Sequence, residues 1–144
     1  MDSAMEEIKK CLTRFAVCVR ERHFAGGREM FYEDVVCFGS RAEILIGLDD
    51  LIERQWKEIW PNITGFHFLT DRFHCEMSAD GRTACVIVPW ISTGYHEDGT
   101  SFPRPGRVTI LLVRDSEQGA WQAKHTHYSL YPGTPNQTYG RTGD

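Results

Sequence analysis

The 144-residue sequence lacks the long apolar segment that a membrane or export function would need. Its longest apolar runs are far shorter than the roughly 20 residues that span a bilayer. The first ten residues carry five charges, so they contain no apolar core of a secretory signal. We therefore expect a cytoplasmic protein with no membrane partner.

An excess of basic residues is also missing. The chain has 16 Lys and Arg against 20 Asp and Glu, a formal net charge of −4. A general nucleic-acid binder needs a basic face that displaces counterions from phosphates. We expect no nucleic-acid partner.

Cysteine motifs are absent although cysteine is not. The five cysteines are an odd number and form no C-x-x-C pair, which argues against a disulfide framework and a zinc finger. They are typical of small core side chains in a reducing compartment. The chain also has no G-x-S-x-G nucleophile motif.

Two segments have helical patterns. Ser3 and Glu6 have the spacing of a capping box, which predicts a helix start. Apolar residues then recur every three or four positions to Val19, and the pair Gly26-Gly27 is predicted to end the helix. Residues 28–33 are predicted to add one or two helical turns. A second helix is predicted from Asp49 or Asp50 to Pro61, with Ile52, Trp56, Ile59 and Trp60 on its apolar face.

The rest of the chain has the alternating pattern of strands. A loop over 94–106 is expected to form a rim or a lid, and residues 132–144 are expected to form a flexible or partner-docked tail. The domain itself is expected to cover residues 1–131. The predicted strands are Val35–Phe38, Glu43–Ile46, Phe66–Met77, Thr83–Thr93, Arg107–Arg114 and Ala120–Leu130.

The order of the elements, with helices first and long strands later, predicts an α+β fold in which the helices lie on one face of a curved antiparallel sheet. The segment 107–114 is apolar on both sides: Val108, Ile110 and Leu112 alternate with Leu111 and Val113. Because the helices cover one face only, the second face also needs a cover. We expect a homodimer formed through that outer sheet face.

Three phrases resemble a known family. They are YEDVVCF at 32–38, QWKEIW at 55–60 and WQAKHTHYS at 121–129. Together and in this order they resemble the SnoaL-like branch of the nuclear transport factor 2-like (NTF2-like) superfamily, which includes ketosteroid isomerase relatives. The resemblance covers about residues 5–131. It implies a cone-shaped fold, usually dimeric, whose pocket lies between the helices and the concave face of the sheet.

The resemblance leaves the activity open, because one scaffold hosts many functions. It covers isomerases, aldol-type polyketide cyclases, dehydratases, epoxide hydrolases and non-catalytic association domains. In the steroid isomerases an Asp on the first strand moves the proton and a Tyr on the first helix holds the oxyanion. Gly39 and Phe15 stand at about those positions here, so we do not expect that mechanism.

The candidate catalytic residues come from the last strand. Strict alternation places Trp121, His125 and His127 on one face, and the large aromatic ring predicts that this face points into the cone. An imidazole in an apolar cavity is neutral at pH 7 and can accept a proton. His125 or His127 is therefore the predicted general base, and Arg107 or Tyr32 is predicted to hydrogen-bond the developing enolate oxygen.

Aromatic residues are predicted to line the cavity around these groups. The predicted ligand-binding residues are Phe38, Trp56, Trp60, Trp90 and Ser129. Two histidines two residues apart can also bind a metal, but a site needs a third or fourth ligand at close range. We expect no metal and no cofactor.

Two functions follow from these residues. The first is a cofactor-independent lyase, isomerase or cyclase that acts on a small apolar carbonyl compound. The second is a non-catalytic module in which the cone binds a ligand or a protein. In the first case the ligand is small and apolar or aromatic, and in both cases a homodimer is expected.

Overall fold

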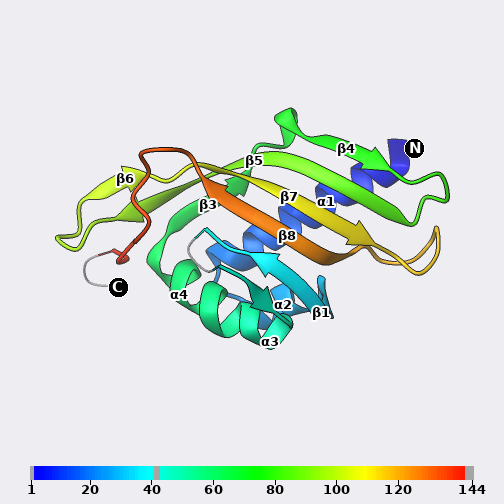
Figure 1. Ribbon diagram of the computed structural model, residues 1–144. Coiled ribbons are helices and arrows are strands. Elements are labelled where there is room, and N and C mark those ends of the chain that lie inside the picture. The colour runs from blue at the N-terminus through cyan, green and yellow to red at the C-terminus, as the bar shows by residue number, and fades with distance from the viewer. Residues whose placement is uncertain (1, 41–42, 142–144) are drawn as a thin grey trace.

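The computed structural model describes residues 2–40 and 43–141. A strongly curved sheet forms one layer, and the helices pack against its concave side (Figure 1). The helices are α1 (Asp2–Arg20), α2 (Phe24–Arg28), α3 (Leu48–Leu51) and α4 (Lys57–Ile59), with a π-helix η1 (Ile52–Trp56) between the last two and short 3-10 helices η2 (Trp60–Asn62) and η3 (Thr70–Arg72).

The described strands form one eight-stranded sheet. Its main path runs β2-β1-β8-β7-β5-β3, and β4 and β6 also pair with β5. The β1–β8 pair is parallel and the others are antiparallel. The strands are β1 (Phe31–Phe38), β2 (Leu45–Ile46), β3 (Thr64–Phe68), β4 (His74–Met77), β5 (Thr83–Tyr95), β6 (Ser101–Pro103), β7 (Gly106–Val113) and β8 (Gln122–Leu130).

The first helix follows the predicted apolar stripe. Ile8, Leu12, Phe15, Ala16 and Val19 are buried along one side of α1, as a period of 3.6 residues requires. The helix ends at Arg20, and the predicted terminator Gly26-Gly27 lies instead in α2. The second predicted helix is confirmed from Leu48, and Pro61 lies in its last 3-10 turn.

Three predicted segments differ from the structure. Residues 28–33 were expected to be helical, but β1 begins at Phe31, because this segment pairs with β8 and buries Phe31, Val35 and Cys37 in the core. The predicted strand 66–77 is interrupted by η3. The predicted loop 94–106 is a hairpin extension, because β6 pairs with the end of β5.

The core lies inside the curve of the sheet and is mainly aromatic. The ring of Phe15 on α1 contacts Phe31, Trp56, Trp60 and Phe68, with centroid distances of 5.5 to 6.5 Å. Helix α1 thus joins both strands and the second helical segment through one side chain. Such packing is mostly hydrophobic burial, which dominates folding energetics.

The C-terminal segment packs on its own chain through residue 141. Thr138 is buried, and its Oγ1 donates to Asn62 O at 2.6 Å and accepts from Tyr95 N at 2.9 Å. Tyr139 N also donates to Tyr95 O. These contacts attach the predicted tail to β5 and η2 (Figure 1), and residues 142–144 lie outside the described part of the chain.

Among residues 2–40 and 43–141, no helix is both long enough and apolar enough to cross a membrane.

Candidate functional site

A cavity lies between the helices and the concave face of the sheet. Its free space is about 40 Å³, room for roughly three waters, which together fill about 90 Å³ of liquid. A ligand of the size of a single six-membered ring matches this space. The lining residues are Phe15, Val19, Ser40, Gln55, Trp56, Ile59, Trp60, Ile63, Phe66, Trp90, Arg104 and Tyr128.

Two stacked indoles form the helical wall. Trp56 and Trp60 are four residues apart, so they lie on one side of their helical segment, and their rings stack at 4.5 Å and 18°. Gly27 in α2 permits this arrangement, because a side chain there would collide with Trp60. The ring of Phe24 stacks on Trp60 at 5.1 Å.

Trp90 forms the opposite wall from the sheet. It is 2% exposed on β5, and its ladder partner on β7 is Gly106. A Cβ at position 106 would collide with the indole of Trp90 and with Ser129 O. The absence of a side chain at this position therefore lets the indole lie against the β7 backbone.

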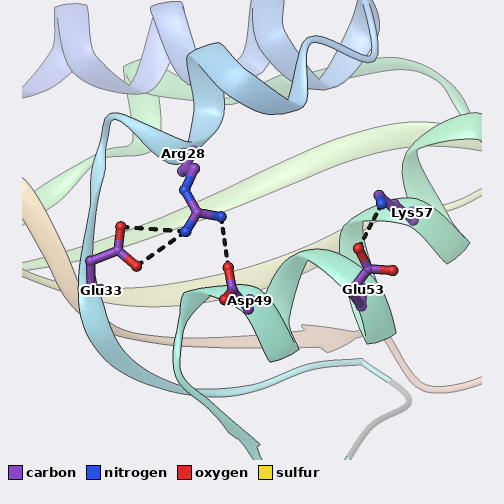
Figure 2. A network of polar contacts seen from close by, with 5 residues as sticks. All are labelled: Arg28, Glu33, Asp49, Glu53 and Lys57. Atoms are coloured by element: carbon purple, nitrogen blue, oxygen red, sulfur yellow. Dashed lines mark hydrogen bonds and ion pairs between the residues drawn. The ribbon is translucent and has the colours of Figure 1, made fainter.

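A network of ion pairs holds the second helical segment against the rest of the chain (Figure 2). Arg28 of α2 contacts Glu33 of β1 at 3.1 Å and Asp49 of α3 at 2.8 Å. The hydrogen bond to Asp49 is the largest cause of a raised pKa of Arg28. Glu53 and Lys57 form a second pair at 2.6 Å along the helix that carries Trp56. Exposed pairs of this kind orient elements more than they stabilise them.

The polar groups of the cavity gather at one end, where β1 stops. Ser40 is just beyond β1, and its Oγ accepts a hydrogen bond from Arg104 Nη2 at 3.3 Å. The carbonyl of Gln55 lies against Gly39, the neighbour of Ser40. Tyr128 follows His127, which pairs with the last residue of β1. The cavity is therefore aromatic over most of its wall and polar at this end.

Arg104 is the charged residue among the described residues that line the cavity. It is 2% exposed, and its guanidinium lies 5.6 Å from the ring of Trp90. Its backbone is fixed by two hydrogen bonds with Ser92, from Arg104 N to Ser92 O and from Ser92 Oγ to Arg104 O. Arginine stays protonated in proteins, so this end of the cavity carries a positive charge.

Tyr128 and Gln55 add neutral polar groups. Burial raises the pKa of Tyr128 far above its usual range, with a smaller effect from Cys37, so its hydroxyl remains a proton donor at neutral pH. Among the described residues, Gln55 Oε1 and Trp90 Nε1 are buried without hydrogen-bond partners. Buried polar atoms are normally bonded, so these groups are available to a ligand.

The described lining of the cavity has hydrogen-bond donors but no side chain that takes up a proton at neutral pH. No Asp, Glu or His is among the described lining residues. Within the same part of the chain, no cluster of three His, Cys, Asp or Glu side chains has the arrangement of a metal site.

The three predicted tryptophans, Trp56, Trp60 and Trp90, do line the cavity. The two histidines do not, and the prediction that they face it is wrong. Ala123 pairs with Leu112 and His125 with Leu111, so Lys124 is an extra residue in β8. This β-bulge reverses the alternation. Trp121 and Ala123 point inward before it, and Thr126 is buried after it while His127 is exposed.

Both imidazoles lie on the outer sheet face beside Phe38. Its ring lies 5.7 Å from that of His125 and 5.1 Å from that of His127, and it is 39% exposed. His125 Nδ1 is hydrogen-bonded to Val36 O at 2.5 Å. Phe38 was predicted to contact the ligand, but it is not part of the cavity wall, because alternation along β1 sends Cys37 inward and Phe38 outward.

The other predicted polar residues are also outside the cavity. Arg107 is exposed and donates to Ser129 Oγ at 3.2 Å, on the outer face. Tyr32 lies under the ammonium of Lys124, 4.8 Å from its ring centroid. The outward positions of Tyr32 and Arg107 follow from the alternation of side chains along a strand, because their neighbours Phe31 and Val108 point inward. His127 and Ser129 line a surface hollow that shares Ser40 and Tyr128 with the cavity.

Sequence reasoning missed Arg104, Gln55 and Tyr128. Phe102, Arg104, Gly106 and Val108 alternate as one buried set, so extending the strand period back through the prolines would have found Arg104. Gln55 is three residues after Ile52 and shares the buried side of the helix. No local signal marks Tyr128, because its direction depends on the bulge.

Fold and site together define an α+β protein with a small, mainly aromatic cavity between its helices and its sheet. The model of the SnoaL-like domain family matches residues 8–133, and the chain belongs to this family. Solved structures with a similar fold include one described as ketosteroid isomerase-like and one described as a putative dehydratase of the NTF2-like family. No curated protein matches the chain.

Solved structures share the fold at low identity. A ketosteroid isomerase-like protein from Erwinia carotovora atroseptica is 15% identical, with a TM-score of 0.72 over 91% of this chain and 98% of that one. An NTF2-like superfamily protein from Salmonella enterica is 17% identical, with a TM-score of 0.72 over 99% and 97%. The association domain of C. elegans CaMKII is 13% identical, with a TM-score of 0.69 over 89% and 96%. These likenesses establish the NTF2-like fold.

Proposed function

We propose that this protein binds a small, flat, mostly apolar molecule in the cavity between its helices and its sheet. The observation that carries this proposal is the wall itself: three indoles and two phenyl rings surround the space, and a few polar groups meet at one end. Binding sites for small molecules have this composition. The size of the space favours a ligand with a single ring.

The chemistry that fits this site is stabilisation of negative charge on oxygen. Arg104 and Tyr128 donate hydrogen bonds, and no described lining side chain acts as a base at neutral pH. These donors support a cofactor-independent lyase- or isomerase-type reaction on a carbonyl compound. Their part in it is to polarise the carbonyl group, not to remove a proton. The site does not support His125 or His127 as the base, because both rings are on the outer face.

The four indole N–H signals in a two-dimensional NMR spectrum test the binding proposal. Trp56, Trp60 and Trp90 line the cavity, whereas Trp121 does not, so it is an internal control. Toluene is expected to shift the first three signals and to leave the fourth in place. Uniform shifts, or no shift at a toluene concentration near saturation, would exclude a ligand cavity.

A matched pair of variants locates the site. Ile59→Phe adds volume to the cavity wall and is expected to abolish the toluene shifts. Ile91→Phe adds the same volume at a position on the sheet that is 37% exposed, and it is expected to leave them unchanged. Equal effects of the two variants would mean that toluene binds elsewhere.

We further propose a homodimer through the outer sheet face. Large apolar side chains gather there across neighbouring strands. In one row Val36 pairs with Ile46 on one side and with His125 on the other, and His125 pairs with Leu111. In the next row His127 pairs with Thr109, which pairs with Ile87. Val36, Ile46 and Ile87 are 36%, 67% and 48% exposed. Contiguous exposed apolar patches mark interaction sites, and the similar structure from CaMKII is an association domain.

Sedimentation equilibrium tests the dimer. The chain is expected to sediment as a dimer, and Ile87→Asp is expected to give a folded monomer because it places a charge in the contact. Ala79→Asp introduces the same charge in an exposed turn and is the control. A wild-type chain that stays monomeric at tens of micromolar would contradict this proposal.

A further inference from the structure

Two buried polar atoms of the cavity lining have no hydrogen-bond partner among the described residues. They are Oε1 of Gln55 and Nε1 of Trp90, and these residues are 8% and 2% exposed. Buried polar atoms in folded proteins are nearly always bonded, because an unpaired one loses its hydrogen bonds to water and gains none in return. A molecule in the cavity would give both atoms a partner.

The chain makes room for the Gln55 amide at this position. Its oxygen occupies the place where a side chain of residue 39 would lie, and residue 39 is glycine. Gln55 belongs to the π-helix η1, a rare kind of helical turn that is found frequently at functional sites. A methionine of the same length would fill the same space without the desolvation of an amide. The amide is therefore better explained by what it binds than by packing.

The two unpaired atoms have opposite hydrogen-bonding roles. The amide oxygen of Gln55 only accepts, and the indole N–H of Trp90 only donates. Gln55 comes from the helical wall and Trp90 from the sheet, so one molecule that bonds both spans the cavity. Such a molecule carries a donor on one side of its ring and an acceptor on the other.

Neither atom needs a charged partner. Ser40 and Tyr128 add hydroxyl groups to the lining, and the described lining has no carboxylate and no imidazole. Arg104 in the same wall already interacts with the protein, since its Nη2 donates to Ser40 Oγ and its guanidinium lies 5.6 Å from the Trp90 ring. A neutral ligand completes the hydrogen bonds of this wall without bringing a further charge into an aromatic interior.

We infer that the ligand of this cavity is a neutral single-ring compound that donates a hydrogen bond to Gln55 Oε1 and accepts one from Trp90 Nε1. The inference rests on the proposed binding function and names the class of its ligand. Phenols, hydroxy-substituted ring ketones and cyclic amides carry both kinds of group. Purely apolar rings carry neither.

Hydroquinone, p-cresol and p-xylene are matched probes, because they share size and shape and have two, one and no hydroxyl groups. A phenol has a pKa of about 10, so all three are neutral at pH 7. NMR titration in the absence of oxygen is expected to show that affinity falls from hydroquinone to p-cresol to p-xylene by roughly tenfold at each step, about the value of one hydrogen bond. A cavity that recognises only apolar surface gives the reverse order, because p-xylene removes the most apolar area from water.

The indole N–H signals test the donor half of the inference. Hydroquinone is expected to move the Trp90 signal downfield, as hydrogen bonding of an N–H does, and p-xylene is expected to lack this effect. Trp121 is the internal control: its Nε1 is also buried without a partner among the described residues, but it does not line the cavity. Its signal is expected to stay in place with every probe.

The variant Gln55→Met tests the acceptor half. Methionine keeps the length of the side chain and removes the amide, so the advantage of hydroquinone over p-cresol is expected to disappear. The free protein is expected to keep or raise its Tm, because an apolar group replaces a buried unpaired amide. Gln122→Met is the matched control, because Gln122 lies outside the cavity and donates to Glu29 O. It is expected to leave all three affinities unchanged.

The outcomes separate this inference from the cavity proposal. If toluene and p-xylene bind tighter than hydroquinone, the hydrogen-bonding ligand is wrong and the cavity proposal stands. If none of the probes binds, both proposals fail together. A hydroquinone preference that survives in Gln55→Met, a loss of folding in that variant, or a Trp90 signal that hydroquinone leaves in place would each overturn the inference.

Discussion

The two faces of the sheet carry similar apolar side chains in different surroundings. On β7, Val108 and Ile110 point inward and are 2% and 5% exposed, whereas Thr109 points outward into solvent. The helices pack against the inner face, and the small cavity lies between them and the sheet. The outer face keeps Ile87 and Phe38 exposed. Apolar pattern alone therefore shows that both faces need a cover, and only the structure shows which of them has one.

The comparison also separates polar groups by their surroundings. The outer His125 is hydrogen-bonded to the Val36 carbonyl and both histidines contact Phe38, whereas the inner Arg104 and Tyr128 lie against the ring of Trp90. Interactions with charge are stronger where water is excluded. The inner groups, not the histidines, are therefore placed to act on a ligand.

The largest contrast is expected from truncating one large side chain on each face. Trp90→Ala empties part of the cavity wall and should lower the free energy of unfolding by about 3–5 kcal/mol. Ile91→Ala, at a position of the same strand that is 37% exposed, should lower it by less than about 1 kcal/mol. Urea denaturation of the two variants measures both values, and comparable losses would contradict the assignment of the faces.

Adding one methyl group tests the close packing of the inner face. Gly106→Ala places a Cβ against the indole of Trp90 and the Ser129 carbonyl. It should destabilise the protein by about 1–3 kcal/mol, as overpacking does. Thr109→Val changes an exposed outer position of the same strand and should stay within about 0.5 kcal/mol. Thermal unfolding compares the pair, and a neutral Gly106→Ala would mean that Trp90 has room to move.

A smaller effect on stability, with a clear effect on binding, is expected at Gly39. A Cβ there collides with the side-chain oxygen of Gln55, which is the movable end of a flexible side chain. Gly39→Ala should displace that amide toward the cavity and weaken toluene binding by about tenfold. The double variant Gly39→Ala, Gln55→Ala should restore binding. Failure of the second change to restore it would place the effect in the backbone.

The smallest effect is expected from the ion pair on the outer face. The hydrogen bond from Lys124, at 2.8 Å, lowers the pKa of Asp34. A lowered pKa in the folded state contributes stability above the unfolded value of about 3.8 to 4, and this contribution is lost as the pH falls through the folded value. In Lys124→Met the pKa of Asp34, followed by NMR, should return toward the usual range. An unchanged pKa would show that another group lowers it.

Much of the fold could be predicted from local patterns. The stripe of α1, the helix that ends near Pro61 and the alternation of β5 and β7 each depend on neighbours in the chain. The start of β1 and the hairpin at β6 could not be predicted as well. Their hydrogen-bond partners are distant strands, so tertiary pairing overrode the local preference.

The candidate site was predictable only in part. Trp56, Trp60 and Trp90 lie at positions that helical or strand periodicity places inside. His125 and His127 lie after a bulge, where the period no longer applies. Arg104 follows a proline in a segment rich in turn residues, which hid its strand-like alternation.

By itself the sequence determined the elements, the family and the aromatic character of the interior, because periodicity and apolar burial act over short stretches of chain. Tertiary structure alone decided which polar side chains reach that interior. One extra residue, Lys124, turns the end of β8 over, so that the histidines face outward and Tyr128 reaches the cavity. The hydrogen bonds that fix this register are made with β7 and β1, and no window of the sequence contains both partners.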